Sequence, residues 1–103
     1  MFRKARQHIY KDHVHTADIK KSIFNEQTDV DALYASIRRM DYFKISSGDT
    51  VIIRVYDMKR TIGLKRINRQ PTHYMCVVWN IRGKLLSMYP CDSPEGKFLL
   101  NKI

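Results

Sequence analysis

The chain has 103 residues and a formal net charge of +9, from 19 Lys and Arg against 10 Asp and Glu side chains. This length fits one domain with one hydrophobic core, spanning residues 1–103, and the charge predicts binding to a polyanion such as a nucleic acid, or to an acidic protein. No apolar run approaches the roughly 18 residues of a membrane span, and the N-terminus lacks the apolar stretch of a signal peptide, so we expect an aqueous environment and no membrane span.

The first forty residues predict helices. Apolar side chains recur at helical spacing within residues 2–12, 17–25 and 28–40. Thr16 is a candidate N-cap for the middle segment. Thr28 and Asp31 fit the capping-box pattern, which predicts that the last helix begins after Thr28.

Beyond residue 40 the apolar pattern has a period of two and predicts strands. These strands are expected at residues 51–55, after a turn at 46–49, and then at 61–67, 73–79, 84–89 and 97–100. Asn80 and Gly83 predict a turn with a left-handed glycine, and a loop is expected over residues 90–96. The predicted fold class is α+β, with N-terminal helices packed on a four- to five-stranded antiparallel sheet.

The last hairpin offers side chains for RNA binding. Strand alternation places Leu85, Ser87 and Tyr89 on one face, with Leu86 and Met88 on the other. The Ser87 hydroxyl can hydrogen-bond a phosphate oxygen, and the Tyr89 ring can stack on a base. The alternative is that Tyr89 is a half-buried aromatic residue that only packs within the sheet.

The N-terminal segment is rich in basic residues and histidines. They are Arg3, Lys4, Arg6, His8, Lys11, His13 and His15. An imidazole titrates near neutral pH, and nearby cations favour its neutral form, so such a histidine can move protons at an RNA 2'-hydroxyl. The alternative is a solvated basic helix. The His13-x-His15 spacing alone is weak evidence for metal ligation, and we predict no metal and no cofactor.

A second basic group and two cysteines complete the candidate residues. Lys65, Arg66 and Arg69, with Arg54 and Arg60, are expected to form a cluster that contacts phosphates, although charge runs are often only solvated faces. Cys76 and Cys91 are too widely spaced for a CxxC motif. They are expected to be reduced thiols, and a disulfide across the hairpin is the open alternative.

The hairpin segment 74–89, YMCVVWNIRGKLLSMY, resembles the last hairpin of the colicin D catalytic domain. Upstream, Lys4, Arg6 and His8, followed by Ile9 and Tyr10, resemble the basic residues and the catalytic histidine of that family. The order of helices followed by a four-stranded antiparallel sheet is similar to the barnase, EndoU, colicin and RelE ribonuclease group, which includes the toxin domains of contact-dependent inhibition systems.

The resemblance implies an endoribonuclease that cuts RNA, and tRNA in particular, without metal and leaves a 2',3'-cyclic phosphate. It implies His8 as the general acid or base, Lys4 and Arg6 as stabilisers of phosphate charge, and Ser87 with Tyr89 as the pair that positions the substrate. The family histidine is followed by a short turn, whereas Lys11-Asp12-His13 follows here, so His13 or His15 can hold the role instead.

The resemblance also implies an antibacterial toxin. Such a domain acts in the cytoplasm of a target bacterium, is delivered as the C-terminal part of a larger secreted protein, and is neutralised by an acidic immunity protein. Three alternatives stay open. Residues 43–55 resemble the RelE-type toxins, which cleave mRNA. A non-catalytic nucleic-acid-binding module needs the same charge but no histidine, and the third alternative is a protein that only binds an acidic partner.

Overall fold

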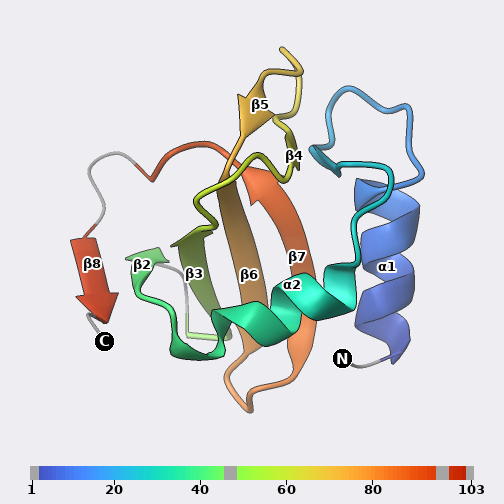
Figure 1. Cartoon of the computed structure of the whole chain (residues 1–103). Helices are drawn as coiled ribbons and strands as arrows, with labels where there is room; N and C mark the ends of the chain where they lie inside the picture. Colours follow the sequence, from blue (N-terminus) through green and yellow to red (C-terminus); the bar gives the residue numbers. More distant parts are fainter. Residues whose placement is uncertain (1–2, 46–48, 95–97, 102–103) are drawn as a thin grey trace.

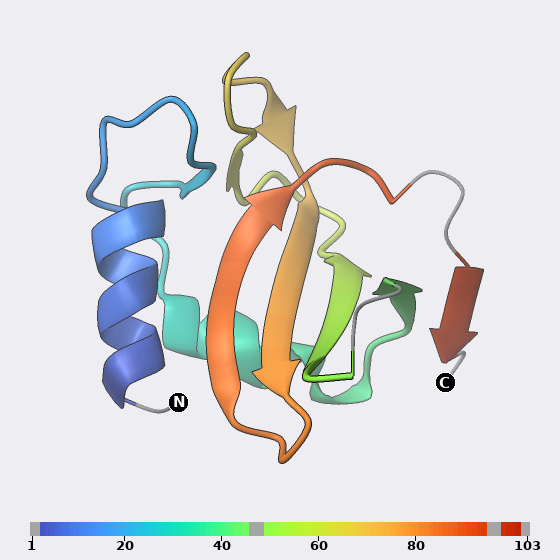
Figure 2. The same cartoon turned by 180° about the vertical axis from the view of Figure 1, so that it is seen from behind.

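A computed structural model describes residues 3–45, 49–94 and 98–101 and confirms the predicted α+β class (Figures 1 and 2). Its helices are α1 (Arg3–His13), α2 (Val30–Ser36) and the 3-10 helix η1 (Ile37–Arg39). The larger sheet is antiparallel in the order β7 (Leu85–Cys91), β6 (Tyr74–Asn80), β3 (Val51–Asp57), β2 (Tyr42–Ile45), β8 (Phe98–Asn101). The smaller has the order β1 (Ile23–Phe24), β4 (Gly63–Leu64), β5 (Pro71–Thr72). No helix in these described residues is long and apolar enough to span a membrane.

The helix predicted for residues 17–25 is wrong. The segment turns at Asp18, whose carboxylate accepts a hydrogen bond from the backbone N–H of Lys20 at 2.9 Å, and it ends in the short strand β1. A carboxylate that bonds the backbone two residues ahead stabilises a turn at the expense of a helix. The chain can therefore bring residues 20–22 back toward the end of α1.

The helix predicted after Thr28 begins one residue later. Its N-cap is Asp29, whose side chain accepts from the backbone N–H of Ala32 at 3.1 Å. A carboxylate at this position satisfies a free N–H group and also opposes the positive end of the helix dipole. The helical region continues through η1 to Arg39, close to the predicted end at residue 40. The predicted N-cap, Thr28, is wrong, because Asp29 caps the helix.

The β6–β7 hairpin forms as predicted, with Gly83 at a φ of 87° in its turn. The pairing register shifts near Leu86, which leaves this residue without a cross-strand partner and 39% exposed. Leu85 is therefore buried in the core together with Met88, and the prediction that it shares a face with Ser87 is wrong. A bulge of this kind reverses the alternation of side chains on one side of the extra residue.

Other strand boundaries differ from the expectation. Only Gly63–Leu64 of the predicted strand 61–67 is extended in a sheet, and β7 continues through Pro90 and Cys91, where a loop was predicted. Strand β2 has no counterpart among the predicted strands. The predicted turn at 46–49 and the loop at 90–96 fall partly outside the described residues.

The two faces of the five-stranded sheet have different surroundings. One face packs against α2 and holds the buried side chains of Tyr56, Met75 and Val77. The opposite face carries Ser87 and Tyr89, and Figure 2 shows that neither helix lies over it. Helix α1 lies along the outer side of β7 in both ribbon views (Figures 1 and 2). It can therefore place side chains on either face.

Replacing Gly63 with alanine should destabilise the fold by about 1–3 kcal/mol or more, because the added Cβ would overpack a rigid site. That Cβ would lie 2.7 Å from Cγ of Pro90 and 2.8 Å from Cα of Phe24. Both neighbours are buried, so neither can move aside easily. Urea unfolding followed by circular dichroism measures the change, and Ala17→Gly, at an exposed loop position, is a small-residue control. An unchanged midpoint for Gly63→Ala would contradict this packing.

Candidate active site

Helix α1 brings His8 to the last strand of the hairpin. Nε2 of His8 lies 3.1 Å from the Oγ atom of Ser87, although the two residues are 79 positions apart in sequence. Ala5 and Ile9 are buried in the core one helical turn apart and hold the helix against the sheet. His8 and Asp12 form the neighbouring stripe of the helix, since residues four apart share a face. The packing of α1 thus fixes the histidine beside β7.

Asp12 orients the His8 ring. Its carboxylate lies 2.8 Å from Nδ1 of His8 and 2.7 Å from Nζ of Lys21. The hydrogen bond from Lys21 lowers the pKa of Asp12, so the carboxylate is ionised at neutral pH. We assign the Nδ1 proton of His8 to this contact, which leaves Nε2 facing Ser87. An ionised partner can also compensate a positive charge on the imidazole.

His13 stands next to His8 and is held differently. Its Nδ1–H donates to the backbone carbonyl of Ser22 at 2.8 Å, and its ring stacks on Tyr89 with the centroids 5.1 Å apart. The His8 and His13 rings meet edge to face at 5.5 Å. Burial lowers the pKa of His13 and favours its neutral form, in which Nε2 carries a free lone pair.

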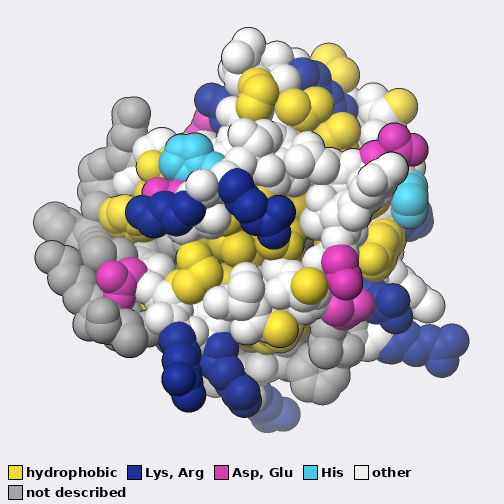
Figure 3. Space-filling view, viewed as in Figure 1, with side chains coloured by type: hydrophobic (Ala, Val, Ile, Leu, Met, Phe, Trp, Pro, Cys, Tyr) yellow, Lys and Arg dark blue, Asp and Glu magenta, His cyan; other side chains and the backbone are white. Residues whose placement is uncertain are grey.

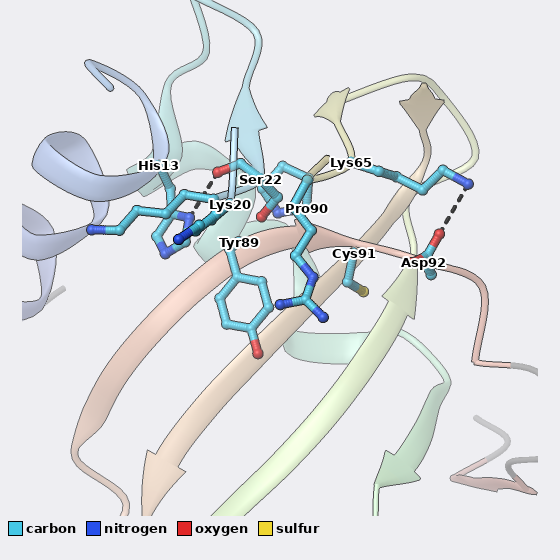
Figure 4. A pocket seen from close by; sticks show the side chains of 10 residues that line it. His13, Lys20, Ser22, Lys65, Tyr89, Pro90, Cys91 and Asp92 are labelled. Atoms are coloured by element: carbon cyan, nitrogen blue, oxygen red, sulfur yellow. Dashed lines mark hydrogen bonds and ion pairs between the residues drawn. The ribbon is translucent and has the colours of Figure 1, made fainter. Parts of the chain in front are cut away.

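A cavity of about 430 Å³ opens beside His13 and Tyr89 (Figure 4). Its lining includes the cationic side chains of Lys20, Lys21, Lys65 and Arg66. Lys65 pairs with the lining carboxylate of Asp92 at 2.9 Å and Lys21 pairs with Asp12 at 2.7 Å, whereas no carboxylate among the described residues pairs with Lys20 or Arg66. The cavity therefore combines an imidazole, an aromatic ring and several cations, which is a suitable environment for a phosphate group.

The loop at residues 65–70 is bound to the segment at 18–22 and forms one wall of this site. The Arg69 guanidinium donates to the backbone carbonyls of Lys21 at 2.7 Å and Asp18 at 3.0 Å. Ile67 donates its N–H to the carbonyl of Ile19, and both Ile67 and Arg69 have positive φ. The prediction that Arg69 serves in a phosphate-binding cluster does not fit this arrangement, since its guanidinium is used to join two loops.

The predicted basic cluster is divided. Lys65 and Arg66 line the His13 cavity, whereas Arg54 lies on the α2-covered face between the rings of Tyr42 and Trp79. Arg60 lies in a different hollow, lined also by Asp57 and His73. The single cluster expected from the sequence is therefore wrong, because Arg54 lies on strand β3 whereas Arg60, Lys65, Arg66 and Arg69 lie in the connections after β3 and β4.

The predicted N-terminal residues also separate. Arg6 pairs with Asp31 at 3.2 Å on a different side of α1 from His8. Lys4 is exposed one turn before His8 and so lies on the same side of the helix. His15 stacks on Tyr10 and is not part of the cavity lining. The structure thus brings together His8, His13, Ser87 and Tyr89, with Lys65 and Arg66 nearby.

Tyr89 is the link between the histidines and the two cysteines. Burial and the thiol of Cys76 raise the pKa of Tyr89, so its hydroxyl remains protonated and can donate a hydrogen bond. Cys76 and Cys91 are free thiols in contact with each other. A hydrogen bond from Cys91 lowers the pKa of Cys76, and the same contact raises that of Cys91. The reduced state of the two thiols stays a prediction.

Several residues of the site were not predicted. Asp12, Lys20, Lys21 and Ser22 are the main ones. Asp12 could have been found from its position four residues after His8, because that spacing joins side chains on a helix. Lys20, Lys21 and Ser22 belong to the segment predicted as helix, and their position follows from the turn at Asp18.

A comparison of the chain with protein-family models, curated proteins and solved structures finds no match. The resemblance to colicin D therefore stays a prediction. Among the described residues, no three His, Cys, Asp or Glu side chains converge as a metal site would require.

The half-buried His13 should make the stability of the fold depend on pH. Its ordinary pKa is 6.5 and the folded state lowers it, so the unfolded chain binds the proton more readily. The contribution of neutral His13 to the free energy of unfolding is complete above pH 6.5 and is lost as the pH falls through the lower pKa of the folded state. We expect a lower Tm at about pH 5.5 than at about pH 7.5. The difference in Tm should be smaller in His13→Phe, which keeps an aromatic ring at this position but has no group that titrates. Equal pH dependence in both proteins would contradict the burial of His13.

Proposed function

We propose that the chain is a metal-independent endoribonuclease, with tRNA as the preferred substrate. The proposal rests on a pair of adjacent imidazoles beside a cationic cavity, one half-buried with a lowered pKa and the other bonded to a carboxylate. Two titratable groups in such different environments suit the two opposite proton transfers that RNA cleavage needs. The net charge of +9 supports the binding of a polyanion.

In the proposed reaction His13 is the base and His8 is the acid. Nε2 of His13 accepts the proton of the ribose 2'-hydroxyl, while the 2'-oxygen forms a bond to phosphorus. The bond from phosphorus to the 5'-oxygen breaks, and protonated His8 gives its Nε2 proton to that oxygen. The products are a 2',3'-cyclic phosphate and a 5'-hydroxyl, and water returns the proton from His13 to His8.

The remaining groups of the site stabilise charge and hold the substrate. Lys21 and Arg66 line the cavity and can compensate the charge that develops on the phosphate oxygens. The Ser87 hydroxyl lies 3.1 Å from Nε2 of His8. When the substrate binds and replaces Ser87 as the partner of this imidazole nitrogen, the hydroxyl can donate to a phosphate oxygen instead. Tyr89, which remains protonated, can donate a further hydrogen bond.

A substrate with one deoxyribose tests this reaction. A short RNA that is cut at one position should become resistant when only the nucleotide before that position lacks its 2'-hydroxyl, because the nucleophile is then missing. The same substitution elsewhere in the strand is the control. Cleavage of the substituted position would contradict the proposed nucleophile. Binding that falls steeply with salt, with no cleavage of any RNA, would favour a non-catalytic nucleic-acid-binding module instead.

The proposal extends to the biological setting implied by the resemblance to colicin D. We propose a toxin that acts in the cytoplasm of a target bacterium and is blocked by an acidic immunity protein. The cations around the cavity, Lys20, Lys21 and Arg66, would attract such a partner to the active site. A complex that suppresses cleavage and dissociates more readily in Lys20→Ala or Arg66→Ala than in Arg39→Ala would support this role, since Arg39 is exposed and does not line the cavity.

A second candidate function comes from the order Asp12, His8, Ser87. These side chains are linked at 2.8 Å and 3.1 Å in the sequence of contacts that activates a serine nucleophile. Ser87 stands within a strand, and not on the sharp turn of a nucleophile elbow, which favours the ribonuclease. A fluorophosphonate probe discriminates between them, because labelling of Ser87 would indicate acyl transfer, whereas a ribonuclease should remain unlabelled.

A further inference from the structure

A second cavity, of about 520 Å³, lies between the α2–η1 region and the covered face of the sheet. Its lining is mainly aromatic and cationic: Tyr34, Tyr56, Trp79, Arg38 and Arg54, with Ala35 and Ile37. Figure 3, which views the molecule from the side that carries α2, shows Lys and Arg side chains along its lower edge, below hydrophobic surface. The volume is within the range of about 300–1,000 Å³ that is usual for small-molecule sites.

The aromatic wall of this cavity is held in place by hydrogen bonds and ring contacts. The indole N–H of Trp79 donates to the hydroxyl of Tyr34 at 2.9 Å, and the two rings lie 6.4 Å apart. Tyr56 is buried in the sheet and contacts the ring of Tyr42. A fixed aromatic surface costs little to order on binding and suits the stacking of a flat ring.

Arg54 lies among aromatic side chains and also hydrogen-bonds the Tyr56 hydroxyl. The Arg54 guanidinium lies 4.2 Å from the centroid of Tyr42 and 5.3 Å from that of Trp79. Within the described part of the chain, neither Arg38 nor Arg54 forms an ion pair. Arg54 is only half-exposed, so an anion placed beside it would interact more strongly than one at an open surface.

We propose that this cavity binds one nucleotide unit, with its base stacked on the wall formed by Tyr34 and Trp79 and its phosphate bound by Arg38 and Arg54. An aromatic surface favours a flat ring, and two guanidinium groups in the same cavity favour a phosphate. A nucleotide contains both, as its base and its phosphate. The unit can be a free mononucleotide or part of an RNA strand. The site is on the opposite face of the sheet from Ser87 and does not depend on the proposed cleavage.

Fluorescence of Trp79, the one tryptophan in the chain, measures this binding directly. The full chain carrying His8→Ala is titrated at low salt with 5'-AMP and with a short single-stranded RNA, so that no cleavage interferes. We expect saturable quenching. Arg38→Ala should weaken binding by about tenfold, the size of effect expected for one charge-assisted contact. Arg39→Ala removes the same charge from the next, exposed residue of η1, which does not line the cavity, and should bind as before.

Further ligands decide which part of the nucleotide is recognised and where it comes from. Adenosine and ribose 5-phosphate should each bind more weakly than 5'-AMP, because each lacks one of the two contacts. Tighter binding of the RNA strand than of 5'-AMP would identify the strand as the source, and the reverse order would identify the free nucleotide. The proposal is overturned if no ligand quenches saturably, if ribose 5-phosphate or polyglutamate binds as well as 5'-AMP, or if Arg39→Ala weakens binding as much as Arg38→Ala.

Discussion

Replacing His8 with alanine should lower the rate of RNA cleavage by about 10²–10⁴-fold, the usual contribution of one general acid or base. The proposed acid is lost, while the side chain is 43% exposed and contributes little to the core, so the fold should be kept. Single-turnover cleavage of a labelled RNA measures the effect at the chemical step. Circular dichroism and the unfolding midpoint show whether the variant is folded.

His15→Ala is the matched control for this variant. His15 comes two residues after the end of α1, the helix that carries His8. It stacks on Tyr10 and does not line the cavity. Its variant should cleave at nearly the rate of the unmodified chain. If His15→Ala is inactive and His8→Ala is active, the roles assigned from the contact with Ser87 are wrong.

Asp12→Asn should lower the cleavage rate by about 10²-fold or more, since a carboxylate that holds a catalytic histidine fixes its tautomer and stabilises its charged form. An amide at this position has no charge with which to compensate protonated His8, and it can turn its NH2 group toward Nδ1. The contact with Lys21 also loses its ionic character. The pH–rate profile should change in this variant, because Asp12 acts through the protonation of His8.

Asp31→Asn gives the corresponding control. Asp31, in α2, pairs with Arg6 on a different side of α1 from His8, and the Asp31 side chain is 42% exposed. The substitution removes the same charge and should leave the rate and its pH profile unchanged. A similar loss in both variants would show that the effect comes from overall charge and not from the orientation of His8.

The sequence predicted the order of helices and strands because periodicity and turn residues act locally. The hairpin with Gly83 and the α1 helix with Ala5 and Ile9 are of this kind. The errors have other causes. The turn at Asp18 depends on a side-chain hydrogen bond that competes with the helix, and the placement of Leu85 depends on a bulge that alternation alone does not indicate.

The candidate site was predicted in part for the same reasons. The strand pattern indicates Ser87 and Tyr89, and the resemblance to colicin D implies His8; the structure places these side chains in one neighbourhood. Lys21 and Ser22 come from a segment whose path depends on contacts with a loop nearly fifty residues further on, through Arg69. Such contacts between distant segments have no signal in the local pattern.

We propose that the neighbouring imidazoles of His8 and His13 cut RNA without metal. Incubation of the chain with total tRNA in EDTA, followed by analysis of the new 3' ends, tests this claim most directly. We predict discrete cuts that leave a 2',3'-cyclic phosphate and that are greatly reduced in both His8→Ala and His13→Ala. Intact tRNA after long incubation, 3'-hydroxyl ends, or full activity in both variants would contradict it.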